Sequence, residues 1–209
     1  MKNIVDYNKT LILFGRSPFI NEIKNEIPLL IKKYHTMGCN YFCETFPDVE
    51  YVIFYDDISP KVKAESIIIT NIRHYHEKTK VSYKLCHEHK NVEFYTINKF
   101  DNDFSTGDSK LNFCIHTPSM ALNWAYKKGF KTVILAGIDL IKNTPHFDAE
   151  TAPDATFPNF DDSAIKRARK HLTDVASRYL KIYQLNPKSD IELEKITIRE
   201  LLNNEFNFK

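Results

Sequence analysis

The sequence predicts an α/β fold with a single, mostly parallel sheet flanked by helices, a Rossmann-like domain. Three observations indicate it: short apolar runs recur along the 209 residues, amphipathic stretches separate several of them, and glycine or polar turns follow their ends. The run at 133–136 is continuously apolar, which is typical of a parallel strand that is covered on both faces. Alternation of such strands with helices favours a parallel sheet.

The first half of the chain supplies most of the expected strands. Thr10–Phe14 is predicted to be the first strand, and the turn Gly15-Arg16-Ser17-Pro18 follows it. Apolar residues at helical spacing predict an amphipathic helix over 20–34, with a kink or an early turn at Pro28. The segment 99–110 is polar and is expected to be a loop. Further strands are predicted at 37–42, 51–55, 66–70 and 92–97.

The stretch 113–139 is the most informative part of the chain. The polar turn 116–119 begins a helix, with Thr117 as the expected N-cap and Pro118 at the first helical position. Gly129 suits the residue that closes this helix. The strand 132–136 follows directly. It runs into Gly137-Ile138-Asp139, so the stretch forms half of an α/β unit with polar residues at both ends.

The segment 143–162 lacks a periodic pattern and contains three prolines. A loop of this length in a compact domain is usually functional or disordered, so the segment is a candidate lid. Asp161 or Asp162 is expected to cap a long basic helix over 163–180. A strand at 181–185 and a short helix at 198–202 complete the predicted fold.

Length and composition predict one domain over residues 1–209, because no linker or repeat divides the chain. The net charge of +2 is too balanced to indicate a general nucleic-acid binder. No apolar stretch reaches the length of a membrane span, and the first residues lack the apolar core of a signal peptide. We therefore expect a protein of the cytoplasm, or of the host cytoplasm for a phage protein, without membrane insertion.

Two groups of residues raise the question of a metal site. A cluster of nitrogen and sulfur ligands has a spacing that fits no familiar closed zinc site, so a solvated surface face is expected there. Its members are His74, His76, Cys86, His87 and His89.

The acidic groups Asp56-Asp57 and Asp101-Asn102-Asp103 offer the hard oxygen ligands that Mg²⁺ prefers. We predict no metal site and no required cofactor, with Mg²⁺ or Mn²⁺ at these acids as the alternative.

Three polar turns coincide with predicted strand or helix ends. The turn 15–18 offers backbone amides and the Ser17 hydroxyl to a phosphate, with the next helix behind them. His116, Thr117 and Ser119 place side-chain donors at a helix start. Asp139 ends a strand, where a carboxylate can accept hydrogen bonds from a ribose. Each turn has a plain alternative as a cap or connection, and capping does not require His116.

Taken in order, these motifs resemble those of the Campylobacter-type bacterial sialyltransferases and their relatives. The resemblance runs from about Leu11 to Ser189 and implies a nucleotide-binding domain of that fold type. It rests on Phe14-Gly15-Arg16-Ser17-Pro18-Phe19, Cys39-Asn40, Phe54-Tyr55-Asp56, Thr117-Pro118-Ser119, Gly129-Phe130-Lys131, Ala136-Gly137-Ile138-Asp139 and Asn186-Pro187-Lys188-Ser189.

The chain departs from that family at several functional positions. Arg16 and Asp56 stand where the family has asparagines. Ile141 and Phe147 occupy the approximate places of two tyrosines that hold the donor phosphate. No histidine lies between 159 and 170, where the family has its base. The resemblance thus implies a nucleotide-sugar donor without specifying sialic acid.

These features predict an inverting glycosyltransferase that moves a sugar from a nucleotide sugar to an acceptor hydroxyl. His146 is the first candidate for the general base, with His116, Asp148 and Asp162 as rivals. Arg16 is expected to stabilise phosphate charge. The residues predicted to bind the nucleotide sugar are Gly15, Arg16, Ser17, Asn40, Asp56, Thr117, Ser119, Gly137 and Asp139.

The acceptor is predicted to be a glycan, or a hydroxylated base in modified phage-like DNA. The basic helix at 163–180 is the observation that keeps DNA open, since clustered Lys and Arg can follow a phosphate backbone. One alternative is a catalytically inactive nucleotide-binding module. Another is a pyrophosphokinase-like enzyme, which would need Asp56, or Asp101 and Asp103, to hold Mg²⁺.

Overall fold

A computed structural model describes residues 9–99, 103–105, 107–141, 144–148 and 161–203. The described strands form one sheet, parallel throughout, in the order β6-β5-β4-β3-β2-β1-β7-β8-β9. The predicted α/β class is therefore confirmed. The strands are β1 (Thr10–Phe14), β2 (His35–Cys39), β3 (Tyr51–Ile53), β4 (Ile67–Asn71), β5 (Val92–Lys99), β6 (Lys110–Phe113), β7 (Thr132–Ala136), β8 (Lys181–Gln184) and β9 (Glu194–Lys195).

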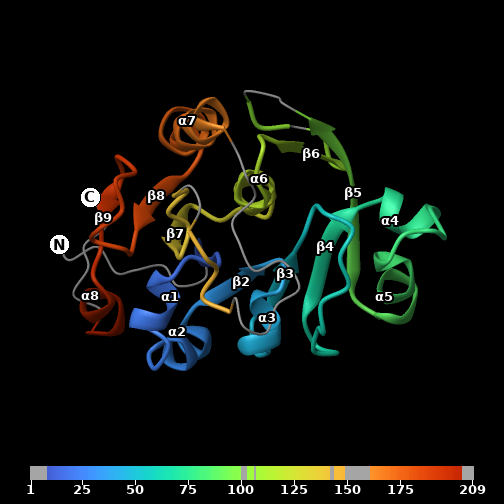
Figure 1. The fold of residues 1–209 in the computed structure, drawn as a ribbon, viewed down its shortest axis with the longest axis horizontal. Coiled ribbons are helices and arrows are strands. Elements are labelled where there is room, and N and C mark those ends of the chain that lie inside the picture. Colours follow the sequence, from blue (N-terminus) through green and yellow to red (C-terminus); the bar gives the residue numbers. More distant parts are fainter. Residues whose placement is uncertain (1–8, 100–102, 106, 142–143, 149–160, 204–209) are drawn as a thin grey trace.

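Helices cover both faces of this sheet (Figure 1). One face carries α6 (Thr117–Lys127), α7 (Asp162–Lys170), the π-helix η2 (His171–Val175) and the 3₁₀-helix η3 (Ala176–Arg178). The other face carries α1 (Phe19–Glu22), α2 (Ile27–Lys33), α3 (Phe42–Thr45) and α8 (Ile198–Asn203). Helices α4 (Arg73–His76) and α5 (Ser82–Glu88) lie beside β4 and β5.

Strands β1 and β7 are the centre of the fold, and every residue in both is buried. Because each strand faces a helical layer on either side, alternate residues enter the two cores: Leu13 packs with one and Phe14 with the other. This burial explains why both strands are apolar without alternation. None of the helices in the described ranges is long and apolar enough to cross a bilayer.

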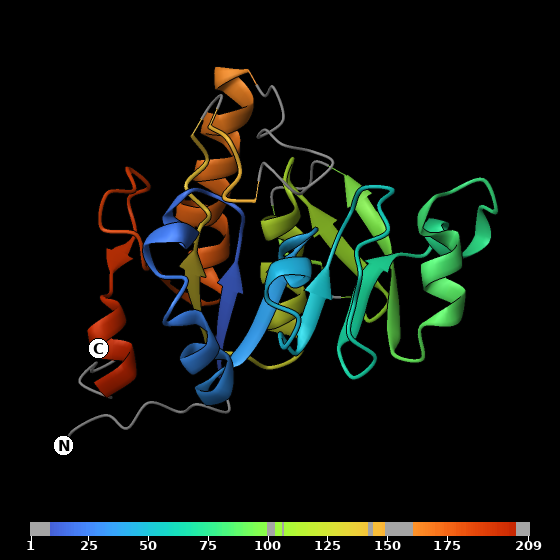
Figure 2. The same cartoon turned by 60° about the horizontal axis from the view of Figure 1, so that its bottom comes forward.

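The strand order reverses between β1 and β7. From β1 the chain builds outward to β6, crosses back through α6, and resumes on the other side of β1 as β7. The register pairs Phe14 with Ala136 on one side and with Gly38 on the other. The residues that follow these three strands therefore meet at one edge, where ligands bind in open α/β sheets. Figure 2 shows the strand arrows pointing to the edge at which α7 begins.

Several predicted elements need correction. The helix expected over 20–34 is divided into α1 and α2, because Pro28 lies in the first turn of a new helix, where its missing N–H costs nothing. The strand expected at 37–42 begins and ends earlier, as β2. Strands β6 and β9 were not predicted. The former begins at Lys110, so the loop expected over 99–110 is shorter, and 100–102 and 106 lie outside the described residues.

The surface face predicted around the histidines is wrong in part. His74 and Cys86 are buried, whereas His76 and His87 are exposed. The His74 ring lies 2.8 Å from the Thr70 hydroxyl through Nδ1 and stacks on Phe54. Burial lowers the pKa of this imidazole. The face predicted to be solvated thus packs through one histidine, His74 of α4, onto β4, because a neutral imidazole is compatible with a core.

The basic helix predicted over 163–180 is capped by one of the two expected residues, but it is not α-helical throughout. Asp161 caps it, since a carboxylate oxygen of its side chain accepts the Ala164 N–H at 2.7 Å. The run then changes from α-helix to π-helix at His171 and to 3₁₀-helix at Ala176. Most of the candidate lid, 143 and 149–160, lies outside the described residues.

Candidate functional site

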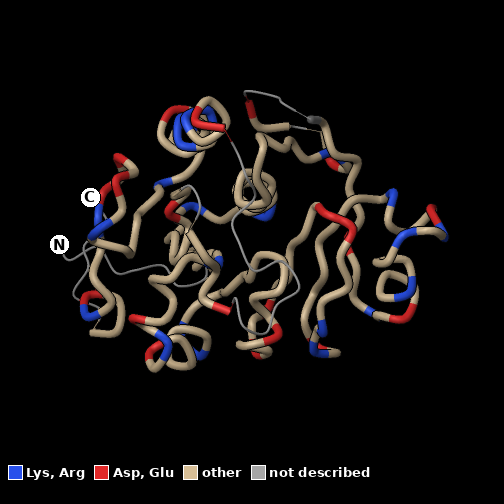
Figure 3. The backbone as a smooth tube through the Cα atoms, in the orientation of Figure 1, with Lys and Arg blue, Asp and Glu red and all other residues tan. Residues whose placement is uncertain are grey.

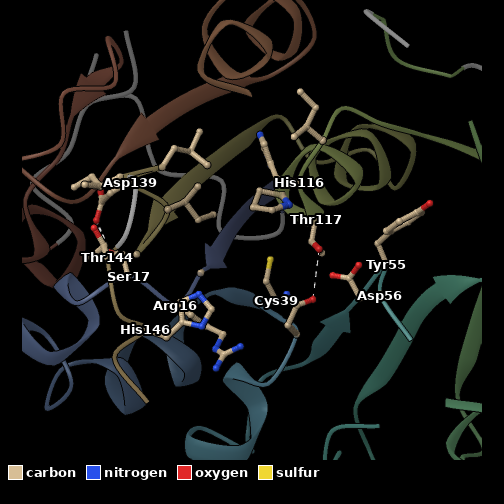
Figure 4. Close-up of a pocket in the computed structure, with 18 of the residues that line it drawn as sticks. Arg16, Ser17, Cys39, Tyr55, Asp56, His116, Thr117, Asp139, Thr144 and His146 are labelled. Carbon is tan, nitrogen blue, oxygen red and sulfur yellow. Dashed lines mark hydrogen bonds between the residues drawn. The ribbon is translucent and has the colours of Figure 1, made fainter. Parts of the chain in front are cut away.

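A pocket of about 340 Å³ opens at the sheet edge where the strand order reverses (Figure 4). Its walls come from the segments that follow β1, β2, β3 and β7, and from the start of α6. It brings together most of the site predicted from the sequence. The predicted residues that line it are Gly15, Arg16, Ser17, Asn40, Asp56, His116, Thr117, Gly137, Asp139 and His146.

The floor of the pocket is made by two turns in close contact. The Gly15 N–H donates to the Ala136 carbonyl at 2.8 Å, and the Ser17 N–H donates to the Gly137 carbonyl at 2.9 Å. A Cβ on Gly15 would lie 2.3 Å from the Gly137 carbonyl oxygen. Gly137 has a φ of +69°, and a Cβ there would strike Ile20. Packing between the turns therefore accounts for both glycines.

Asp139 is the buried carboxylate of this pocket, only 3% exposed. One of its oxygens, Oδ2, accepts a hydrogen bond from the Ser17 hydroxyl. The other oxygen, Oδ1, is buried and has no hydrogen-bond partner among the described residues. A buried acceptor without a partner costs free energy, so this oxygen is suited to a donor group on a ligand. Figure 4 shows Asp139 and Ser17 on one side of the pocket.

The start of α6 forms the opposite wall, and its cap corrects the prediction. The N-cap is His116 rather than Thr117: its Nδ1 accepts the Ser119 N–H at 3.2 Å. Pro118 is then the second helical residue, where it still removes no helical hydrogen bond. Histidine is an uncommon cap, so capping preferences alone favoured the neighbouring threonine.

Ser119 is the predicted nucleotide-binding residue that the structure places elsewhere. Its side chain is fully buried and does not line the pocket. Its hydroxyl accepts the Cys114 N–H and donates to the His116 carbonyl, both at 2.7 Å. This serine therefore stabilises the turn that leads into α6, and the assignment to ligand binding is corrected.

His116 is also in contact with the π-helix behind the pocket. Its ring lies edge-on to that of His171, with the centroids 6.5 Å apart. Burial, together with the neighbouring His171, lowers the pKa of His116 to about 3 against a weaker opposing effect of the Ala168 carbonyl. Burial lowers the pKa of His171 to about 4. Both rings are therefore neutral near pH 7, and His116 is poorly suited to be a general base.

The wall between these two sides comes from β2 and β3. Asn40 has a φ of +54° and accepts a hydrogen bond from the Thr117 hydroxyl at 3.4 Å. This contact joins the end of β2 to the start of α6. Asp56 lies on the exposed rim after β3, beside Tyr55, whose ring stacks on Phe113 at 4.0 Å. Tyr55 belongs to one of the motifs that carry the resemblance, but the sequence does not predict it as a site residue.

Arg16 does not face the pocket as an unpaired cation. Its guanidinium and the Asp148 carboxylate form a buried ion pair, with the Nη2 to Oδ1 distance at 2.9 Å and both Nε contacts near 3 Å. The two side chains are 3% and 4% exposed. The Tyr41 ring covers the guanidinium at 5.4 Å. The pair carries no net charge. The stabilisation of phosphate charge that was predicted for Arg16 must therefore come from another group.

The same ion pair holds His146 beside the pocket. The Phe147 N–H donates to the Arg16 carbonyl at 2.9 Å, and the Phe147 ring packs against Phe42 and Phe46. We call 144–148, which these contacts fix across the end of β1, the strap. His146 lies on the pocket side of the strap and is labelled beside Arg16 in Figure 4. Asp148, a rival base, is the anchor of the strap.

Two pocket residues have backbone conformations that sequence reasoning could not anticipate. Ile115 has a φ of +70° and Leu140 a φ of +51°. A β-branched residue such as Ile115 is a genuine outlier in this region, and such strain concentrates at functional sites. Residue-type preferences do not predict a positive φ at either position. Only the structure therefore shows that both residues line the pocket.

The acidic candidates for a metal site do not converge. Asp103 accepts hydrogen bonds from the Tyr179 hydroxyl and the Phe104 N–H, away from the pocket that Asp56 lines. Asp57 is bound to Ser82. Asp101 and Asn102 lie outside the described residues. Within the described ranges no three His, Cys, Asp or Glu side chains are arranged to hold a metal ion.

Comparison with known proteins adds one fold relationship. Neither a protein-family model nor a curated protein sequence matches the chain. A solved structure of the MAf glycosyltransferase from Magnetospirillum magneticum AMB-1 is similar, with a TM-score of 0.62 and 11% sequence identity. The similarity covers 95% of this chain but 35% of the larger protein. It shows a shared fold, whereas the resemblance to sialyltransferases stays a prediction.

Proposed function

We propose that this chain is a glycosyltransferase domain that moves a sugar from a nucleotide-sugar donor to an acceptor hydroxyl. Asp139 is the observation that carries the proposal. It follows β7, beside the point where the strand order reverses, and offers a buried carboxylate oxygen that has no hydrogen-bond partner among the described residues. A ribose or sugar hydroxyl satisfies such an oxygen. The fold shared with a glycosyltransferase supports the same class of reaction.

The donor phosphate is proposed to lie at the start of α6. This end of the helix forms a wall of the pocket through Thr117, and its partial positive charge favours an anion. The helix replaces Arg16 in this role, because the Arg16 charge is balanced by Asp148. Asn40 and Thr117 then contact the nucleotide between the two walls.

We assign the general base to His146, which the strap holds at the pocket. It removes the proton from the acceptor hydroxyl while that oxygen forms a bond to the anomeric carbon. The bond from the same carbon to the donor phosphate breaks, and its electron pair leaves with the phosphate. Attack on the face opposite the phosphate inverts the anomeric centre. The acceptor is proposed to be a carbohydrate hydroxyl, and no metal is assigned a step.

The proposal is tested by incubating the protein with UDP-, GDP- and CMP-sugars and measuring the free nucleotide that is released. We expect release from one nucleotide class, accelerated when a carbohydrate acceptor is added. Binding of a nucleotide sugar without release of free nucleotide, whichever acceptor is added, would contradict the proposed transferase activity. That result would favour the inactive nucleotide-binding module.

A further inference from the structure

A second groove adjoins the pocket and has no assigned role. It lies between α7 and the segment after β8, with a volume of about 580 Å³. Leu140 and Ile141 line both the groove and the pocket, so they form a shared wall. Ile141 is 44% exposed, and Ile165 adds a further apolar surface from α7. A molecule in the groove therefore reaches the pocket across an apolar wall.

Within the described residues, Arg169 is held in this groove through one guanidinium nitrogen, Nη2. Its Nη2 donates to the Leu140 carbonyl at 3.3 Å and lies 2.9 Å from the Asp190 carboxylate. Its Nε is buried and makes no hydrogen bond within the described residues. A buried donor on a charged group is costly to leave unpaired. The planar fork of an arginine matches a carboxylate or a phosphate.

The rim of the groove carries two more cations. Lys166 projects from the exposed side of α7, and Lys188 follows β8. Figure 3 shows the basic residues gathered along α7. The carboxylates nearby are well solvated: Asp162, which also lines the groove, is exposed, Asp190 is 65% exposed, and Glu22, the partner of Lys188, is 51% exposed. Such solvated ion pairs contribute little energy, so an incoming anion can compete with Asp190 for Arg169 and with Glu22 for Lys188.

We propose that this groove binds the acceptor, and that Arg169 recognises an anionic group on it, the carboxylate or phosphate of an acidic saccharide. The assignment rests on the proposed function, because it places the acceptor beside the donor pocket. The anionic group at Arg169 anchors one end of the acceptor. The acceptor then extends across the wall of Leu140 and Ile141, so that its hydroxyl enters the pocket that His146 also lines.

The proposal is tested by NMR with methyl β-glucuronide as the acidic probe and methyl β-glucoside as its uncharged match. Glucose 1-phosphate and inorganic phosphate are tested as well. They distinguish recognition of a carboxylate from recognition of a sugar phosphate or of a bare anion. We expect an acidic sugar to shift the Arg169 Nε–H signal, whereas the glucoside does not. Saturating nucleotide should leave this shift intact, because donor and acceptor occupy adjacent sites.

Single-residue variants identify which side chain binds the acidic sugar. Arg169→Gln should weaken binding of the acidic sugar by about ten- to a hundredfold, as expected for hydrogen bonds to a charged group. Arg167→Gln, on the exposed side of the same helix, is the matched control and should bind normally. Lys166→Gln, at an exposed position, should weaken binding by about two- to fivefold.

Each remaining result has a defined meaning. Equal binding of glucuronide and glucoside, or binding of inorganic phosphate alone, contradicts an acidic acceptor. Salt-sensitive binding of duplex DNA at Arg169 in place of the acidic sugars contradicts it too, in favour of a nucleic-acid acceptor. If nucleotides bind at Asn40 and Thr117 but acidic sugars do not bind, the inference fails alone. If acidic sugars bind and no nucleotide does, the proposed function fails, and the groove loses its acceptor role.

Discussion

At the scale of single residues, His146 and Asp139 divide the proposed work between a base and an acceptor of ligand hydrogen bonds. They approach the pocket from different segments, one from the strap and one from the end of β7. The ion pair of Arg16 with Asp148 serves neither task directly. It holds the strap, and through the strap it positions His146.

Replacing His146 tests the base. His146→Ala should lower turnover by about two to four orders of magnitude, because proton transfer by a positioned base contributes that much. Donor affinity should change little. Steady-state rates with a saturating donor measure the effect, and His76→Ala, at an exposed position on α4, is the control. Turnover near that of the wild type would remove His146 from the role.

The sequence predicted which residues line the pocket well where a strand end determined their position, and less well where a side chain had a choice of partner. Gly15, Ser17 and Asp139 follow strand ends, so the topology alone brings them together. His116 and Ser119 lie in the same short turn, yet one forms the cap and the other is buried behind it. Such local hydrogen bonds depend on rotamers, which residue preferences do not specify.

At the scale of elements, the contact between α6 and the π-helix η2 depends on two neutral histidines. His116 caps the first, and His171 begins the second. A π-helical turn is rare and often lies near a functional site. Here it places His171 against His116, on the far side of the pocket wall.

This contact predicts a loss of stability in mild acid. Unfolded imidazoles titrate near pH 6.5, whereas burial lowers the native pKa values to about 3 and about 4. Between pH 6.5 and about 4 the unfolded chain binds more protons, so the free energy of unfolding falls as pH falls. Each histidine contributes up to about 1.4 kcal/mol per pH unit.

Urea unfolding at several values between pH 6.5 and pH 5 measures this dependence. His171→Phe should reduce the slope but not abolish it, because burial also lowers the pKa of His116 and His74, which remain. His76→Gln, at an exposed position, should leave the slope unchanged. An identical slope in His171→Phe and the wild type would show that His171 is not one of its causes.

The strap predicts a second stability effect. Asp148→Ala leaves the buried Arg16 guanidinium without its counterion and should cost about 3–5 kcal/mol of unfolding free energy. The double variant Arg16→Met/Asp148→Leu should recover much of that loss, because it removes both buried charges. Equilibrium denaturation measures both values. A double variant as unstable as Asp148→Ala would show that the strap depends on the ion pair for more than charge balance.

At the scale of the whole molecule, strand pairing explains why the class of fold was predictable and its details were not. The fully buried strands β1 and β7 carry strong apolar patterns, and the parallel sheet follows from them. Strand β9 has two exposed residues, and β6 lies at the sheet edge with Lys110 exposed. Short edge strands lack the doubly covered pattern that marks a central strand.

The central claim is that the pocket beside Asp139 binds a nucleotide sugar. Thermal unfolding against a panel of nucleotides and nucleotide sugars, with and without Mg²⁺ or Mn²⁺, tests it most directly in the wild type and in Asp139→Asn. A ligand at about a hundred times its dissociation constant adds roughly 2.7 kcal/mol, which raises Tm by about 5–11 °C in a domain of this size. The account predicts such a rise for one nucleotide class and a smaller rise in Asp139→Asn. No rise with any nucleotide, from folded protein, would contradict it.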